Sequence, residues 1–218
     1  MGRDLIMRSS EVLEMLNKGQ IDELKVILQD EVYTESLKSS PNLKKRYAAM
    51  KKYFTYIKSA REACQKPNIV YFEGTSYTSF CNSYSLALTI ESCGVMEMFD
   101  NSNGTYPDTT RVINTDGVSE KVDFGKVFAE ARSKGYKLNK KEVIGNSFLM
   151  LYDGSYFRIG LLEATYNIIN EGGEVTVYHK NKQKNSPITI VNDLGYCVVM
   201  PVRYEPEEGD GVTIIEVK

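Results

Sequence analysis

Hydrophobic residues recur at helical spacing in the first forty residues. Ser9 or Ser10 is placed to cap a short helix that runs to about Leu16 and ends at Gly19. A second helix is predicted over 20–37, before the Ser-Ser-Pro sequence at 39–41. Its apolar face repeats at i, i+3, i+6 and i+7 and consists of Ile21, Leu24, Ile27 and Leu28. Residues 1–42 are therefore predicted to form a helical N-terminal extension.

A longer amphipathic helix is predicted over about 42–65, and it is cationic beside its apolar face. At about 100° per residue, one arc holds Tyr47, Met50, Phe54, Ile57, Arg61 and Cys64. The neighbouring arc holds Lys44, Lys45, Lys51, Lys52, Lys58 and Lys66. One face of this helix can pack against the protein while the next stays in solvent.

Strand patterns dominate the rest of the chain, with two helices among them. Segments rich in aromatic and β-branched residues predict strands at 69–72, 77–81, 86–91, 147–152, 174–179, 188–191 and 196–202. Helices are predicted over 122–133 and 157–169, and 94–121 is predicted to be mostly loop. A helix followed by three strands occurs twice, at 43–91 and 157–202. This order predicts an α+β fold with largely antiparallel sheet and a pseudo-repeat.

Charge is distributed unevenly along the chain. The net charge of −2 hides an acidic start, with eight acids against five cations in residues 1–41. Residues 42–66 carry eight cations against one acid, and 205–218 carry five acids against one cation. A basic block between two acidic ends indicates one cationic face rather than a protein that is basic throughout.

Composition and the absence of motifs exclude several classes. Apolar content of 42% and aromatic content of 11% are ordinary globular values, no run of 18 apolar residues exists, and acids interrupt the start of the chain. We therefore expect a cytoplasmic protein without membrane contact. Four dispersed cysteines and one histidine offer no zinc spacing, and no phosphate-binding or nucleophile-elbow motif occurs. We expect no enzyme, metal or cofactor, and His179 is expected to be an exposed strand residue.

The end of the chain has a distinctive set of residues. Phe157, Leu161-Leu162, Ser186-Pro187 and Tyr196 lead to Met200-Pro201-Val202-Arg203. This stretch resembles the closing part of the bacterial DNA sliding clamp, the β subunit of replicative polymerase. The segment from Tyr106-Pro107-Asp108 to Arg111-Val112-Ile113 is similar to a clamp inter-domain segment. Asn68–Leu88 is similar to a clamp strand–turn unit, with Asn82-Ser83 in place of aspartate–glycine.

The resemblance implies a DNA-clamp-like α+β domain over 43–204, preceded by the helical extension and followed by an acidic tail over 205–218. A bacterial clamp chain holds three such domains, whereas this chain has room for little more than one. The implied function is that of a non-enzymatic accessory (processivity-type) protein in DNA replication or recombination, of a phage or a mobile element. Self-association, which closes the clamp ring, stays open.

Two sets of binding residues follow from this resemblance. Duplex DNA, contacted without sequence preference, would lie on the lysines of the basic helix: Lys44, Lys45, Lys51, Lys52 and Lys58. Peptides of replication proteins would bind a C-terminal pocket. The matching positions are Ser83, Leu86, Pro107, Arg111, Val112, Met200, Pro201 and Val202. The acidic tail could cover either surface.

Two alternatives remain beside the DNA-binding interpretation. One is a clamp-fold protein-interaction module that does not bind DNA, which salt-dependent binding to duplex DNA would distinguish. The other, more distant, is a hydrolase that uses Cys81 or Cys93 with His179.

Overall fold

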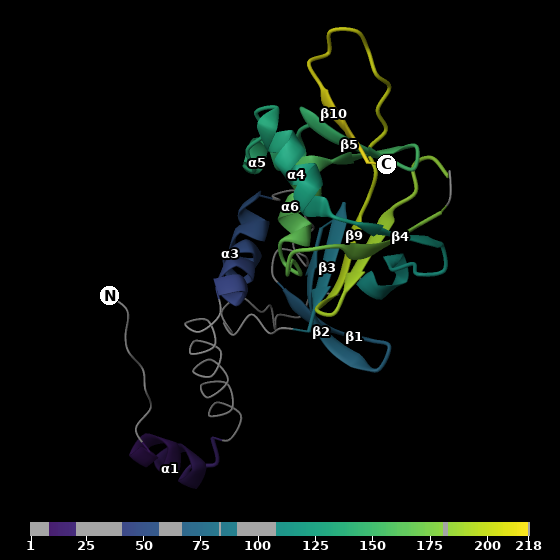
Figure 1. The fold of residues 1–218 in the computed structure, drawn as a ribbon. Coiled ribbons are helices and arrows are strands. Elements are labelled where there is room, and N and C mark those ends of the chain that lie inside the picture. The colour runs from purple at the N-terminus through teal and green to yellow at the C-terminus, as the bar shows by residue number, and fades with distance from the viewer. Residues whose placement is uncertain are drawn as a thin grey trace.

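The computed structural model describes residues 9–20, 41–56, 67–82, 84–90, 108–180 and 183–217. The α-helices in these ranges are α1 (Ser9–Asn17), α3 (Pro41–Tyr56), α4 (Phe124–Ser133), α5 (Lys140–Ile144) and α6 (Ile159–Tyr166), and a 3-10 helix, η3, spans Thr109–Val112. The strands are β1 (Asn68–Phe72), β2 (Thr75–Cys81), β3 (Ser85–Thr89), β4 (Val118–Val122), β5 (Phe148–Tyr152), β6 (Ser155–Arg158), β7 (Val175–His179), β8 (Ile188–Asn192), β9 (Gly195–Val199) and β10 (Thr213–Glu216). The fold is mixed α+β (Figure 1).

The larger sheet is antiparallel and consists of two meanders, β1-β2-β3 and β7-β8-β9, joined through their last strands, with β4 added at the edge beside β7. Its order is β1-β2-β3-β9-β8-β7-β4, and β3 pairs with β9 with Ala87 opposite Cys197. Helix α3 precedes the first meander in the chain and α6 precedes the second. The predicted repeat of a helix followed by three strands, and the predicted antiparallel sheet, are therefore confirmed.

The smaller sheet has the order β10-β5-β6, with β10 parallel to β5. Strands β5 and β6 form a hairpin whose two-residue turn, Asp153-Gly154, has φ angles of 45° and 74°. Asp-Gly suits this left-handed turn, which matches the twist of the strands. The helix predicted from Phe157 thus begins two residues later, because 155–158 form a strand. Residues 205–218, predicted as an acidic C-terminal tail, include strand β10.

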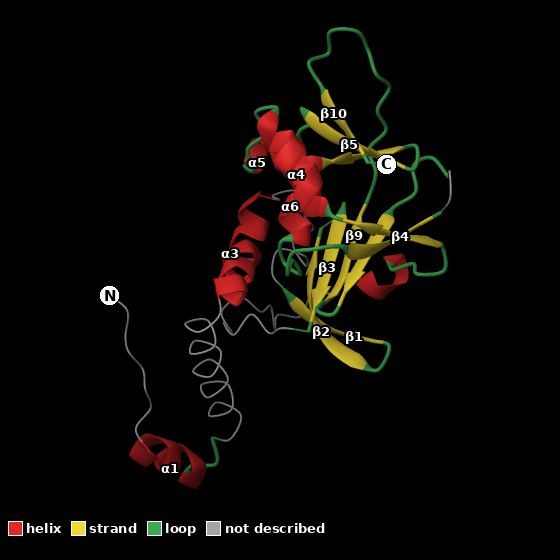
Figure 2. Ribbon diagram, in the orientation of Figure 1, coloured by secondary structure: helices red, strands yellow, loops and turns green. Residues whose placement is uncertain are grey.

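Helix α6 is the central element and is buried along its whole length. It contacts β3 and β9 of the larger sheet, β5 and β6 of the smaller one, and helices α3, α4 and α5 (Figure 2). At Gly160, a Cβ atom would lie 2.4 Å from the carbonyl oxygen of Glu142. Glycine therefore lets the backbones of α5 and α6 approach each other directly.

Side chains on the two faces of the larger sheet belong to different clusters. The main core includes Ala87, Cys197 and Val199 from the sheet, together with Met50 and Tyr53 of α3 and most of α6. On the opposite face, a smaller cluster consists of Tyr77, Cys81, Leu86, Leu88 and Val198. Strand alternation produces this division, since successive residues point to opposite faces. Both helices consequently pack on one side of the sheet.

Other segments differ from the sequence-based expectations or lie outside the described ranges. The region 94–121, predicted as mostly loop, contains η3 and most of β4, and α5 was not predicted. The N-terminal helix agrees with α1, whose Leu13 and Leu16 side chains are exposed. The second helix, predicted over 20–37, lies almost wholly outside the described residues. Within the described part of the chain, no helix has the length and apolar character needed to cross a membrane.

Candidate nucleic-acid interface

Helix α3 carries five cations and no acid in its sixteen residues. Lys44, Lys45, Lys51 and Lys52 are all exposed. A separation of seven residues is about two helical turns, so Lys44 and Lys51 form one row and Lys45 and Lys52 form another. The two rows lie about 100° apart around the helix, and the lysines in each row are about 10.5 Å apart along its axis. Lys58, the fifth predicted contact, lies outside the described residues.

The opposite side of α3 anchors the helix to the sheet. Met50 and Tyr53 are fully buried, and the Tyr53 hydroxyl lies 3.1 Å from Ser85 Oγ in β3. Ser85 Oγ also accepts a hydrogen bond from Thr165 Oγ1 of α6 at 2.9 Å. These three hydroxyls join α3, β3 and α6 in the core. The cationic rows are therefore held on a packed helix.

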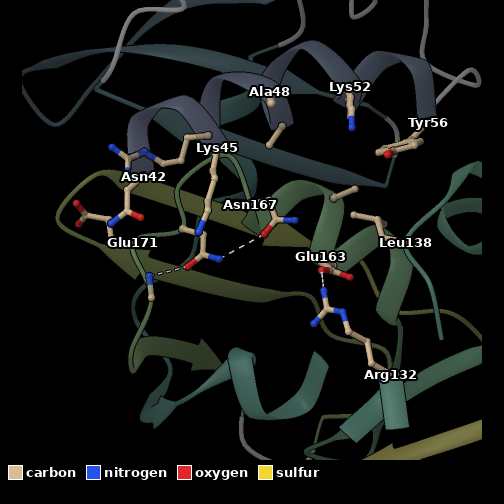
Figure 3. Close-up of a pocket in the computed structure, with 15 residues that line it drawn as sticks. Asn42, Lys45, Ala48, Lys52, Tyr56, Arg132, Leu138, Glu163, Asn167 and Glu171 are labelled. Carbon is tan, nitrogen blue, oxygen red and sulfur yellow. Dashed lines mark hydrogen bonds and ion pairs between the residues drawn. The ribbon is translucent and has the colours of Figure 1, made fainter. Parts of the chain in front are cut away.

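A groove of about 470 Å³ runs along the side of α3 that carries Lys45 and Lys52 (Figure 3). One wall is α3, the second is the C-terminal part of α6 with the residues that follow it, and the third comes from α4 and Leu138. Figure 3 shows Lys45, Lys52 and Tyr56 of α3 facing Asn167, Glu163 and Leu138. The lining residues are Asn42, Lys45, Arg46, Ala48, Ala49, Lys52, Tyr56, Arg132, Leu138, Glu163, Ala164, Asn167, Asn170, Glu171 and Gly172.

The charges around the groove are predominantly positive. Its lining holds four cations, Lys45, Arg46, Lys52 and Arg132, against the two acids Glu163 and Glu171. Glu163 is buried in α6, and its Oε1 accepts a hydrogen bond from Arg132 Nη2 of α4. A buried carboxylate without a partner would cost considerable folding free energy. The ion pair with Arg132 offsets this cost. The net lining charge of about +2 favours an anionic occupant.

Tyr136 lies behind the Arg132–Glu163 pair, and the pKa of its phenol is shifted by burial and by this neighbouring carboxylate. Its ring is almost completely buried. Burial first, and then the negative charge of Glu163, raise the pKa of the Tyr136 phenol far above its usual value. Neither the Tyr136 hydroxyl nor Glu163 Oε2 has a hydrogen-bond partner of normal geometry among the described residues. The polar atoms beneath the groove are thus tightly enclosed.

The residues predicted for a peptide pocket are only partly brought together. Leu86 is buried in the smaller apolar cluster next to Val198, and Ile113 packs against the same cluster. The Met200 amide donates to the carbonyl oxygen of Tyr84, which extends the ladder between β9 and β3. Strand alternation therefore places Met200 on the Leu86 face. Met200 and Val112 are 37% and 45% exposed.

Arg111 of η3 is paired with Asp108, the residue that caps the start of this helix. Its Nε donates to Asp108 Oδ2 at 2.7 Å, and its side chain is largely exposed. Asp108 caps η3 by accepting from the Thr110 amide and hydroxyl. The Thr110 hydroxyl contributes most to lowering the pKa of Asp108.

The remaining predicted pocket residues lie at the end of the second meander or outside the described ranges. Pro201 and Val202 are half-buried, and the Val202 amide donates to the carbonyl oxygen of Tyr156. Val202 is therefore tied to β6 and the smaller sheet. Ser83 and Pro107 lie outside the described residues.

His179 is buried, contrary to the expectation of an exposed strand residue. It is 7% exposed, because the β5–β6 turn folds over the end of β7. Its Nδ1 lies 2.7 Å from Asp153 Oδ2, and its Nε2 lies 3.7 Å from Glu120 Oε1. The Tyr152 ring packs edge-on against the imidazole. His179 thus joins the two sheets.

The cysteines of the hydrolase alternative show no catalytic arrangement in what is described. Cys81 is buried at the end of β2, and its thiol donates to the carbonyl oxygen of Asn82. Cys93 lies outside the described residues. In the described ranges, no three His, Cys, Asp or Glu side chains are placed to hold a metal ion.

The sequence pattern predicted the exposed lysines of α3 but not the opposite walls of the groove. Arg132 and Glu163 come from different helices and pair across 31 positions of the chain, so periodicity within one helix could not reveal them. One available signal was Glu163 itself, the single charge in the otherwise uncharged sequence IGLLEATY. A charge on a buried helix requires a partner.

The chain matches no protein-family model, and no curated protein matches it in sequence.

Proposed function

We propose that the protein is a non-enzymatic DNA-binding accessory protein of the sliding-clamp type, which contacts the sugar–phosphate backbone through α3. The observation that supports this proposal is the charge of α3: five cations, no acid, and four exposed lysines in two rows. The role in replication or recombination rests on the resemblance of residues 68–88, 106–113 and 157–203 to the clamp family.

The geometry of the lysine rows favours contact with phosphates. Lysine is a flexible point charge without the planar fork that reads base edges, so it suits sequence-independent contact. The 10.5 Å spacing within a row is about three phosphate steps of one strand at about 3.4 Å each. A duplex lying along α3 would place several phosphates within reach of both rows.

Duplex binding as a function of salt tests this proposal. The wild-type protein should bind a fluorescently labelled 20-base-pair duplex at low salt, with a log–log salt slope set by its phosphate contacts. Replacing Lys44 and Lys51 by alanine should lower the slope by about 1.8, because each lost contact removes about 0.9. The same loss is expected for duplexes of unrelated sequence.

A matched control removes two exposed lysines from another part of the molecule. Lys180 and Lys184 lie at the β7–β8 connection and are exposed. Their replacement by alanine changes the net charge equally and should leave the slope unchanged. The proposal fails if the wild-type protein shows no binding at low salt, or if the two double variants behave alike.

A second candidate function is a clamp-fold interaction module that binds peptides without binding DNA. The observation that favours it is the exposed Met200 on the Leu86 face of the sheet, against which Ile113, the residue after η3, also packs. A methionine at a partly exposed apolar surface can adapt to different ligands. A peptide with leucine and phenylalanine anchors should then bind, and M200A should weaken it by roughly 1–2 kcal/mol. Equal affinity of the wild-type protein and the M200A variant for the peptide would exclude this function.

A further inference from the structure

We infer that the groove between α3, α4 and α6 accommodates one unpaired nucleotide of a DNA strand whose backbone lies on α3. This inference rests on the proposed DNA-binding function and adds a preference for single-stranded DNA or for the junction of single and double strands.

Cations approach the groove from two opposite walls. Lys45 and Lys52 line it from α3, and Arg132 lines it from α4 (Figure 3). The second lysine row, Lys44 and Lys51, lies on the neighbouring face of the same helix. A strand that follows α3 therefore passes directly beside the groove. Its phosphates can stay on the lysines while one nucleotide turns inward.

One end of the groove has the chemistry of a nucleobase site. The Tyr56 side chain lies at the end of α3 near Leu138, and Lys52 extends beside it (Figure 3). Tyr56 and Leu138 are both half-buried, so each presents part of its apolar surface to the groove. Bases stack on aromatic side chains without regard to sequence, since every base has a flat π-face. A base can therefore lie against Tyr56 while its phosphate meets Lys52.

Small side chains leave the room that such a nucleotide needs. Ala48 and Ala49 of α3 and Ala164 of α6 contribute only methyl groups to the lining. The resulting volume of about 470 Å³ lies within the 300–1,000 Å³ range of small-ligand sites. A larger side chain at Ala49, which is half-buried and faces the groove, would occupy this space.

The groove should bind a nucleotide of single-stranded DNA more readily than one of duplex DNA. In a duplex a base must leave its stack and its partner before it can enter, which costs a few kcal/mol. An unpaired nucleotide does not have to break a base pair. The lysine rows should consequently bind both forms of DNA, whereas the groove should add affinity only for the unpaired form.

The experiment compares a labelled 20-nucleotide single strand with the matching duplex at one salt concentration. A49L should weaken single-strand binding at least fivefold, the equivalent of losing a stacked base, and leave duplex binding unchanged. Y56L, which removes the ring without filling the groove, should produce the same selective loss. The matched control is A129L, because Ala129 is exposed on α4 and lies outside the groove lining.

The outcomes separate this inference from the function on which it rests. If duplex DNA binds but neither A49L nor Y56L weakens the single strand selectively, the groove assignment is wrong and the function of α3 stands. If neither form of DNA binds to the wild-type protein, both are wrong. A 2-aminopurine placed in the single strand should change its fluorescence on binding to wild-type protein and not to A49L. Thermal unfolding of each variant checks that the fold is retained.

Discussion

Ile215 tests whether the C-terminal residues belong to the folded domain or form a separate acidic tail. The side chain is 1% exposed and belongs to the main core cluster, because β10 pairs with β5 and brings Ile215 opposite Met150. Its neighbour Ile214 is only half-buried and points to the other face of the strand. The pair offers the same chemical change, isoleucine to alanine, at a buried and at a half-buried position.

The expected effects follow from burial. Ile215→Ala removes three carbons from a close-packed site and leaves a cavity, which typically costs about 2–5 kcal/mol of unfolding free energy. Ile214→Ala should cost about 1 kcal/mol, since full burial of such a side chain is worth about 1.5–3 kcal/mol. The backbone hydrogen bonds between β10 and β5 remain in both variants.

Urea denaturation followed by far-ultraviolet circular dichroism measures this difference, because the chain contains no tryptophan to report fluorescence. With an m value of about 1–3 kcal/mol/M, the midpoint of Ile215→Ala should fall on the order of 1 M below that of the wild-type protein. Equal midpoints for wild type, Ile215→Ala and Ile214→Ala would show that β10 does not pack into the core. Residues 205–218 would then form an acidic tail that is separate from the folded domain.

Three further predictions concern polar groups in the core. Tyr53→Phe removes the hydroxyl near Ser85 Oγ and should lower the unfolding free energy by about 0.5–1.5 kcal/mol in urea titrations; an unchanged value would contradict that contact. His179→Gln should destabilise the protein by about 1–3 kcal/mol, because the contact between the imidazole and Asp153 across the sheets is lost, whereas Lys180→Gln at an exposed position should not. Burial raises the pKa of Tyr166 to about 12, above its unfolded value of about 10, so its contribution to stability is complete below pH 10 and is lost as the pH rises toward 12. Alkaline unfolding curves should show this loss, and Tyr166→Phe should reduce it; an identical pH dependence in both proteins would contradict it.

Elements with strong local signals were predictable from the sequence. Strands of both meanders alternate or concentrate β-branched and aromatic residues, and they lie within a few residues of the predicted ranges. Helix α4 was found from Phe124, Val127, Phe128 and Ala131, all of which are buried. The lysine rows of α3 were predictable for the same reason, because helical periodicity places exposed residues as reliably as buried ones.

Features that depend on contacts between distant segments were not predictable in this way. The last two residues of β6, Phe157 and Arg158, were predicted as the start of the following helix, which begins at Ile159 in the structure. The Asp153-Gly154 pair between two short apolar segments was the available signal for a hairpin. Strand β10 is a short apolar segment among acidic residues. Its position in the fold depends on its pairing with β5, which is distant in the sequence. His179 is buried by the β5–β6 turn, which lies 26 residues away in the chain.

The groove beside α3 follows from the way the two halves of the repeat differ. Helices α3 and α6 both pack on the same side of the larger sheet, and Tyr53 and Thr165 meet at Ser85, beside the junction of β3 and β9. The smaller sheet covers α6, so all eight of its residues are buried, whereas α3 keeps an exposed face with four lysines. Because α6 is covered and α3 keeps a face in solvent, the space between the two helices stays open on the solvent side of α3. In the proposed function this asymmetry is essential, because covering α3 as α6 is covered would remove both the lysine rows and the access to the groove.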